Sequence, residues 1–287
     1  MKKIKYVFEA LIIYFIFFII KIIGFKLSRK IFPTIFKKIG PFFKSETIID
    51  QNIDRISRGL ASYDKDSIKD KMWENYGNVF IEYLFLSKFK TDNSHINIKG
   101  KQYIEKIIKN NETTIFISGH LANFEFMSME LTKMKIKLAT IYRPLNNFFL
   151  NPFMEHLRKQ YICKNQIKKG IPGIRQAVEY INKNYSIALM VDQRVSEGKL
   201  LPFFGEDAWT TTLPAQLALK YKCNITPISI YRVDDKFEME ILKPIEVTNM
   251  ENNEENKIKI SSEINKTIEI MIKKDPSQWI LTHNRWK

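Results

Sequence analysis

The pattern of apolar and polar residues predicts a long N-terminal apolar helix followed by strands and helices in alternation. Residues 6–25 are mostly apolar, and residues 10–20 contain no charged side chain. Two further segments, 46–60 and 66–88, carry apolar side chains at helical spacing. The apolar stripe of the second segment is more typical of a protein core than of a binding site, although it could also contact lipid.

The rest of the chain predicts an α/β domain. Runs rich in β-branched and aromatic residues predict strands at 95–98, 113–117, 136–142, 187–191, 224–231 and 237–242. Helical patterns cover 101–109, 147–162, 173–184, 213–222 and 254–273. This alternation favours a mixed, largely parallel sheet flanked by helices on both faces. We therefore expect an N-terminal membrane anchor over residues 1–30 and one domain over residues 31–287.

The segment from Thr113 to Glu125 contains the first candidate chemistry. The predicted strand ends at Ser118 and Gly119, which places His120 at a strand end and Glu125 in the first turn of a helix. On one continuous helix the two side chains would point about 140° apart. With His120 on the turn, the carboxylate can reach the imidazole and fix its tautomer, so that the other nitrogen can take a proton. The simpler alternative is an ordinary polar histidine and a carboxylate favoured by the helix dipole.

Polar side chains also follow two other predicted strands. Arg143 comes directly after strand 136–142, and Asp192 and Arg194 follow strand 187–191. Ligands bind at the carboxyl ends of parallel strands, so these side chains and His120 should form one polar cluster. Taken singly, Arg143 could pair with a surface carboxylate and Asp192 could cap a loop.

The positive charge is concentrated near the N-terminal apolar segment. The formal net charge is +15, and residues 1–44 contain ten basic side chains and one acidic. Six basic residues follow the centre of the apolar segment and three precede it, so the positive-inside rule places the domain in the cytoplasm. A cleaved signal peptide fits less well, because Lys21 and bulky apolar residues follow without a small-residue cleavage site. We expect an uncleaved anchor in the cell inner membrane, spanning or interfacial, with a buried core helix as the alternative.

Composition excludes several classes of protein. Hydrophobic residues make up 45% and aromatic residues 13% of the chain, which is too apolar for disorder. The two cysteines and four histidines lack the spacing of a disulfide framework or a zinc site. The sequence contains no nucleic-acid recognition module, and its basic excess lies at the membrane end. We expect no metal and no nucleic-acid partner.

Six segments in a specific order carry a resemblance to a known family. They are Ser-Gly-His-Leu-Ala-Asn-Phe-Glu at 118–125, Tyr-Arg-Pro-Leu-Asn at 142–146, Asp-Gln-Arg at 192–194, Ile-Thr-Pro-Ile at 225–228, and the longer blocks 201–215 and 278–287. With the anchor, they make the chain similar to the bacterial lipid A biosynthesis (late) acyltransferases of the lysophospholipid acyltransferase superfamily. Leu213 and the segment His283-Asn-Arg285 depart from the family pattern.

The resemblance implies transfer of a fatty acyl chain from acyl carrier protein to a hydroxyl of a lipid A precursor. His120 would be the general base and Glu125 would orient it. The side chains of Arg143 and Arg194 would bind phosphate or stabilise the oxyanion. A loop at 205–212 would shape the acyl or carrier-arm pocket. The residues implied in substrate binding are Asn123, Arg143, Asp192, Arg194, Gly205 and Thr211.

The resemblance implies no cofactor, and the expected partners are acyl carrier protein, the lipid A precursor and membrane lipids. Coenzyme A as donor remains an alternative. Lysophosphatidate or a glycosyl lipid as acceptor would use the same His120 and Glu125. A non-catalytic membrane scaffold is a third alternative, against which the intact His-x4-Glu segment counts.

Overall fold

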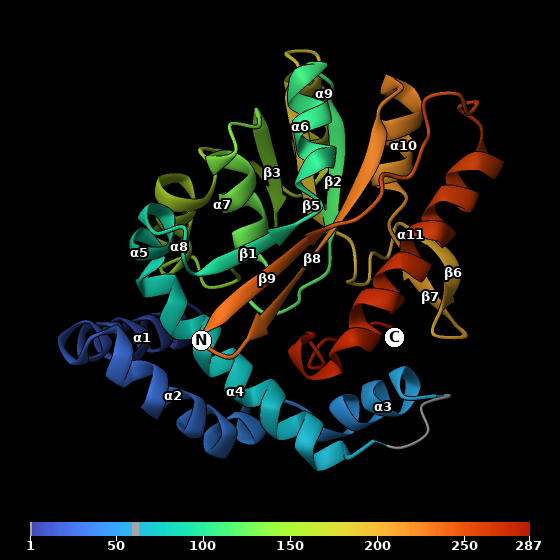
Figure 1. Ribbon diagram of the computed structural model, residues 1–287. Coiled ribbons are helices and arrows are strands. Elements are labelled where there is room, and N and C mark those ends of the chain that lie inside the picture. Colours follow the sequence, from blue (N-terminus) through green and yellow to red (C-terminus); the bar gives the residue numbers. More distant parts are fainter. Residues whose placement is uncertain (1, 59–62) are drawn as a thin grey trace.

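A computed structural model describes residues 2–58 and 63–287 of the chain. Its N-terminal part is helical, with α1 (Lys2–Ile23), α2 (Phe25–Ile39), η1 (Gly40–Phe43), α3 (Glu46–Ile56), α4 (Lys65–Leu84) and α5 (Leu86–Thr91). Figure 1 shows α1 to α4 gathered along one side of the sheet. The helix predicted over 46–60 ends at Ile56, and its last residues, 59–60, lie outside the described residues. The helix predicted over 66–88 is two helices separated at Phe85.

A seven-stranded sheet with the order β1-β9-β8-β2-β5-β3-β4 forms the centre of the protein. Every neighbouring pair is parallel except the antiparallel β8 and β9, which confirms the predicted mixed, largely parallel sheet. The strands are β1 (Ile96–Lys99), β2 (Thr114–Ser118), β3 (Leu138–Tyr142), β4 (Asn165–Lys168), β5 (Ser186–Met190), β8 (Asn224–Val233) and β9 (Lys236–Ile241). The sequence patterns missed β4, a short polar edge strand.

Helices cover both faces of the sheet and enclose two apolar cores. One core involves α9 (Ile171–Ile181), α10 (Leu213–Tyr221) and α11 (Glu254–Lys274); the other involves α5, α6 (Lys101–Lys109), α7 (Glu125–Lys133) and α8 (Asn151–Leu157). In β2, Ile115 and Ile117 face the first core and Phe116 faces the second. Side chains alternate between faces in a strand, so β2 is apolar throughout because both faces are covered.

A separate hairpin of β6 (Lys199–Phe203) and β7 (Glu206–Thr210) packs beside α11. Phe204 and Gly205 turn the hairpin with positive φ angles of 53° and 78°. These angles match a two-residue hairpin turn, which favours glycine. The segment 205–212, expected to be a pocket loop, is therefore largely an ordered strand.

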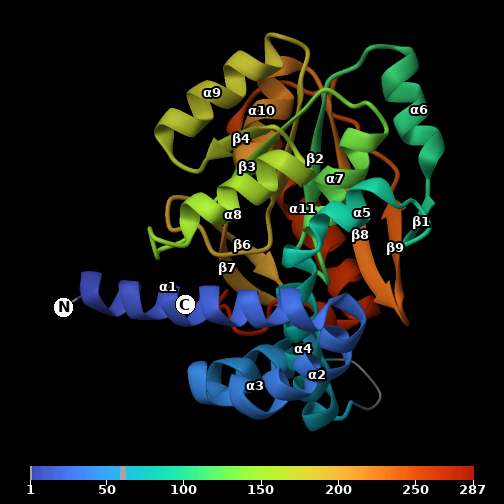
Figure 2. The same cartoon turned by 90° about the vertical axis from the view of Figure 1, so that its left-hand side faces the viewer.

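Helix α1 lies alongside the domain, next to α2 and beneath the sheet in Figure 2. Its inner face packs through Phe17, which contacts Phe80 of α4 and Phe153 of α8. Its outer face carries seven large apolar side chains that are more than half exposed, those of Ile4, Phe8, Leu11, Ile12, Phe15, Phe18 and Ile22. Among the described residues, α1 is the one helix long and apolar enough to cross a membrane, and it is a candidate membrane anchor.

Helix α2, which the sequence patterns did not predict, ties this anchor to the domain. It packs closely on α4, where Gly77 approaches the backbone at Pro33; a Cβ at Gly77 would lie 2.8 Å from the Cα of Pro33. The boundary expected at residue 30 falls inside α2. The anchor segment and the domain are thus in direct contact.

Candidate active site

His120 lies on an irregular loop that follows the carboxyl end of β2, as the sequence predicted. Its Nδ1 lies 2.7 Å from Oδ1 of Asp192, and its backbone N–H donates to Oδ2 of the same carboxylate at 2.9 Å. Asp192 follows β5, the direct neighbour of β2 in the sheet. A carboxylate accepts hydrogen bonds, so Nδ1 carries the proton and Nε2 is left to accept one.

The expectation that Glu125 would contact the imidazole is wrong, because Asp192 occupies that position. Glu125 does lie in the first turn of α7, but its Oε1 accepts hydrogen bonds from Tyr83 Oη and from Arg158 Nε, the latter at 2.8 Å. The turn at residues 119–124 directs the two side chains of the His-x4-Glu segment to different partners. The strand-end rule had placed Asp192 near His120 but could not identify the pair.

Asp192 is held as a carboxylate although it is almost fully buried. Trp279 Nε1 donates to its Oδ2 at 2.8 Å. Burial alone would raise the pKa of Asp192, but the imidazole of His120 and the three hydrogen bonds hold that pKa at about 2. A negative charge fixed against Nδ1 stabilises an imidazolium that forms when Nε2 takes a proton.

Glu125, Arg158 and Tyr83 form a second buried polar group beside the ring. The guanidinium of Arg158 lies 2.7 Å from the Glu125 carboxylate and also packs over the rings of Tyr83 and Tyr142. Burial and the carboxylate of Glu125 raise the pKa of the Tyr83 hydroxyl. Arg158 begins a π-helical turn, Arg158–Ile162, directly after α8. Such turns are rare and occur frequently at functional sites.

Two cavities of different chemistry meet at His120 and Phe124. The first, about 360 Å³, is apolar; its lining includes Ile13, Phe17, Phe36, Val79, Phe80, Leu150 and Met154 from α1, α2, α4 and the α8 region. The second, about 550 Å³, is lined by both apolar and polar side chains and is the more polar of the two; its polar lining includes Glu125, Tyr142, Arg143, Arg158, Lys169, Thr211 and His283. The stripe predicted on α4 is therefore divided: Met72 and Trp73 belong to the core, whereas Val79 and Phe80 line the apolar cavity.

The other predicted site residues are divided between this site and the rest of the protein. Arg143 and Thr211 line the polar cavity, and Arg143 is exposed there. Burial and the charge of Arg143 lower the pKa of the neighbouring Lys169. By contrast, Asn123, Arg194 and Gly205 line neither cavity.

Each of these three residues has a structural explanation. Asn123 is completely buried and donates to Glu82 Oε2 at 3.0 Å. The backbone N–H of Arg194 donates to His283 Nε2 at 3.1 Å. Gly205 lies at the exposed turn of the β6–β7 hairpin. Burial and the bond to Glu82 give Asn123 a structural role, and its predicted contact with substrate stays a prediction.

The C-terminal segment completes the site. In the sequence, this segment was identified only as part of the family resemblance. Trp279 forms an isolated antiparallel bridge with Leu121, next to His120 in the chain. His283 lines the polar cavity, and burial lowers the pKa of its imidazole to about 4. Tyr83, Arg158 and Trp279 were not assigned to the site from the sequence, because no local pattern marks a partner distant in the chain.

The fold and site define a class of α/β proteins with a histidine–carboxylate pair at the carboxyl edge of the sheet. The histidine of this pair lines both the apolar and the polar cavity. The family model described as bacterial lipid A biosynthesis acyltransferase matches residues 1–287, the whole chain. The protein therefore belongs to the bacterial lipid A biosynthesis acyltransferase family. No curated protein matches the chain.

Proposed function

We propose that the protein transfers a fatty acyl chain from the thioester of an acyl carrier protein to a hydroxyl of a lipid A precursor. The observation that carries this proposal is the position of His120, which lines both the apolar and the polar cavity. The apolar cavity would take an acyl chain. The polar cavity, with Arg143 and Lys169 at its wall, would take a phosphate-bearing headgroup.

In the proposed mechanism His120 is the general base. Its Nε2 takes the proton of the acceptor hydroxyl while the hydroxyl oxygen attacks the thioester carbonyl. The tetrahedral intermediate then collapses, the carbon–sulfur bond breaks, and the imidazolium returns its proton to the leaving thiolate. Asp192 keeps the tautomer and stabilises the imidazolium, and the positive charge of Arg158 at the polar cavity would stabilise the oxyanion.

Glu125 acts in this mechanism through Arg158 and Tyr83. Its carboxylate holds the guanidinium beside the polar cavity and neutralises part of its charge. Without that partner, a buried guanidinium would be left uncompensated. Both members of the His-x4-Glu segment thus contribute, but to different parts of the site.

The acceptor is tested by an assay of purified protein with acyl carrier protein thioester or acyl-coenzyme A. Three reactions are compared: one with a tetra-acylated disaccharide as acceptor, one with lysophosphatidate, and one without an acceptor. We expect transfer to the disaccharide at a rate well above that of the other two reactions. Transfer confined to lysophosphatidate would overturn the lipid A assignment, and absence of any transfer would favour a scaffold.

The segment after Arg143 provides a variant that separates acceptor from donor. Phe148 and Phe149 are exposed apolar residues, at 48% and 41%, next to Leu145, which lines both cavities. Phe148→Asp/Phe149→Asp should reduce acylation of the disaccharide far more than hydrolysis of the donor by water. Val233→Asp/Ile270→Asp is the matched control, since both residues are exposed and line neither cavity.

The packing of α1 supports an orientation in the plane of one leaflet of the inner membrane, on the cytoplasmic face. Asn147 donates to the backbone oxygen of Tyr6, and Lys21 donates to the backbone oxygen of Leu84, so both ends of α1 bind the same domain. A 22-residue helix is about 33 Å long, close to the thickness of the hydrocarbon core. An α1 that crossed the bilayer would carry Asn147 and the adjoining polar surface into it.

This orientation is tested by labelling single cysteines with a membrane-impermeant maleimide in sealed inverted vesicles. Lys3→Cys lies in the first turn of α1 and Lys38→Cys lies in α2, beyond the other end of α1, and the native Cys163 and Cys223 are buried. We expect both introduced cysteines to react from the cytoplasmic side. Reaction of only one of them would show that α1 crosses the membrane.

A further inference from the structure

The loop that carries His120 has no regular secondary structure, yet each residue from His120 to Asn123 makes a specific hydrogen bond or bridge to another part of the chain. The N–H of His120 is bound to Asp192, and Leu121 forms a bridge with Trp279. Ala122 has a positive φ of 44°, which is unfavourable for a residue other than glycine. Surrounding contacts must hold the loop in this conformation.

Two of these contacts come from one buried polar network. The N–H of Ala122 donates to the backbone oxygen of Gln278 at 2.9 Å, and Asn123 Nδ2 donates to Glu82 Oε2 at 3.0 Å. Glu82 on α4 pairs with Arg232 on β8 through both carboxylate oxygens, one of them 3.1 Å from Arg232 Nη2. The carboxylate of Glu82 is completely buried.

Arg232 also connects the two contacts to each other. Its backbone N–H donates to Gln278 Oε1 at 2.7 Å, and its backbone oxygen accepts from Gln278 Nε2 at 2.9 Å. The network therefore joins α4, β8, the C-terminal segment and the loop of His120. Gln278 lines the apolar cavity, whereas neither Glu82 nor Arg232 lines either cavity.

A buried ion pair contributes little net stability, because desolvation offsets most of the attraction between the charges. Well-packed apolar side chains could fill the same space at similar or lower free energy. What apolar side chains could not supply is a directed hydrogen bond to Asn123. The chemistry of the pair thus fits a role in fixing geometry.

We propose that Glu82 and Arg232 are positioning residues for His120, which they hold through Asn123 and Gln278. They fix the direction in which Nε2 meets the acceptor hydroxyl and the thioester, without contacting either substrate. The proposal rests on the acyl transfer proposed above. A displacement of about 1 Å in a catalytic group can reduce a rate by about 100-fold, so such positioning is kinetically significant.

The first test is Asn123→Ala, which removes the loop's bond to Glu82 and leaves the ion pair intact. With acyl carrier protein thioester and the tetra-acylated disaccharide, we expect kcat to fall by about 10- to 100-fold and KM to stay within about 2-fold. A purely structural role would lower the amount of folded enzyme, not the turnover of each active site, so kcat is normalised to folded protein. A folded variant with wild-type kcat would overturn the proposal.

The second test is Glu82→Met/Arg232→Met, which replaces the pair with apolar side chains and leaves Asn123 without its acceptor. We expect a similar fall in kcat at nearly unchanged thermal stability. The matched control is Glu130→Met/Lys133→Met, an acid–base pair on α7 whose side chains are 4% and 13% exposed and which lies outside the site. Equal losses of kcat in the two double variants would overturn the proposal.

A third measurement follows the backbone dynamics of the His120 loop and needs no substrate. Hydrogen exchange followed by mass spectrometry should show faster exchange in peptides that cover residues 118–126 of Asn123→Ala, with α4 and β8 unchanged. Unchanged exchange in the loop would overturn the positioning role. Because this measurement does not depend on the reaction, a wild-type protein inactive with these substrates would overturn the proposed function alone.

Discussion

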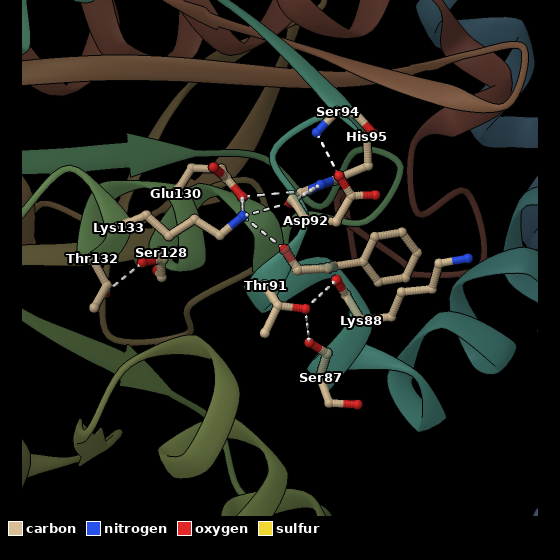
Figure 3. Close-up of polar contacts among 11 residues, drawn as sticks. Ser87, Lys88, Thr91, Asp92, Ser94, His95, Ser128, Glu130, Thr132 and Lys133 are labelled. Atoms are coloured by element: carbon tan, nitrogen blue, oxygen red, sulfur yellow. Dashed lines mark hydrogen bonds and ion pairs between the residues drawn. The ribbon is translucent and has the colours of Figure 1, made fainter.

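The protein contains two histidines with carboxylate neighbours, and their surroundings differ in one respect that separates a site from a core. His120 binds Asp192 through Nδ1, and its side chain lines two cavities. His95 directly precedes β1, and its Nδ1 is 2.7 Å from the backbone oxygen of Asp92 while its Nε2 is 3.4 Å from Glu130. Figure 3 shows this second group.

The imidazole of His95 is buried and lines neither cavity of the site, although its neighbours Glu130 and Lys133 line another of about 470 Å³. Lys133 Nζ donates to Glu130 and to the backbone oxygens of Phe89 and Asp92, as Figure 3 shows. The ring of His95 also packs edge-on against Phe126. Both nitrogens of His95 face protein groups, so a substrate could not reach them. The comparison teaches that a histidine–carboxylate contact indicates catalysis only where one nitrogen faces accessible space.

The largest expected difference between the two groups is in activity after loss of the ring. His120→Ala should lower kcat by roughly 10²- to 10⁴-fold, the usual contribution of a general base. His95→Ala should leave kcat within about 2-fold but destabilise the fold by about 1–3 kcal/mol, because it leaves a cavity and unpaired polar groups. Steady-state kinetics and thermal unfolding of both variants check this prediction. Equal effects on kcat would remove the distinction.

The second largest difference in kcat between the His120 and His95 groups is expected when the carboxylate beside each histidine loses its charge. Asp192→Asn is expected to reduce kcat on the order of 10²-fold, since the imidazolium loses its counter-charge and the tautomer is no longer fixed. Glu130→Gln should change stability and leave kcat near wild type. The comparison is made on folded protein, by single-turnover transfer with saturating donor. A larger loss of kcat in Glu130→Gln would contradict it.

A smaller loss of kcat is expected at Glu125, because its carboxylate binds Arg158 and does not contact the imidazole of His120. Glu125→Gln should lower kcat by roughly 10-fold, because the amide oxygen still accepts a hydrogen bond from Arg158 but no longer balances its charge. Glu125→Ala should be more damaging. The same kinetic assay checks both substitutions. Wild-type activity in Glu125→Gln would remove the charge of Glu125 from the mechanism.

The smallest expected effect is on stability in acid. The folded-state pKa of Asp192 is about 2 and lies below its ordinary value, so the unfolded chain binds this proton first as the pH falls. The stability that the ionised group contributes is present above about pH 4 and is lost as the pH falls toward 2, by about 2 kcal/mol in total. Asp192→Asn should therefore flatten the dependence of unfolding free energy on pH in that window, as urea titrations at several pH values can measure. An unchanged slope would contradict the low pKa.

Local patterns in the sequence predicted most of the architecture. The central strands and the buried helices appear where the apolar periodicity placed them, because burial on one or both faces imposes a regular repeat. The misses have local causes. Strand β4 is short and polar, and basic residues interrupt the apolar pattern of α2. Strand β7 lies in the segment 205–212, which was expected to be a loop.

The site, like the fold, has features that local sequence patterns predict and features that only tertiary packing decides. The positions of His120, Arg143 and Asp192 after three strands follow from the alternation of apolar strands and polar turns, because parallel strands end at one edge. That much is contained in the order of residues. The identity of the partner of His120 is not, since it depends on β2 and β5 being neighbours, and strand order results from packing between distant segments. For the same reason Asp192 contacts the imidazole and Glu125 binds Arg158: the turn at 119–124, held by contacts from α4 and the C-terminal segment, directs each side chain to its partner.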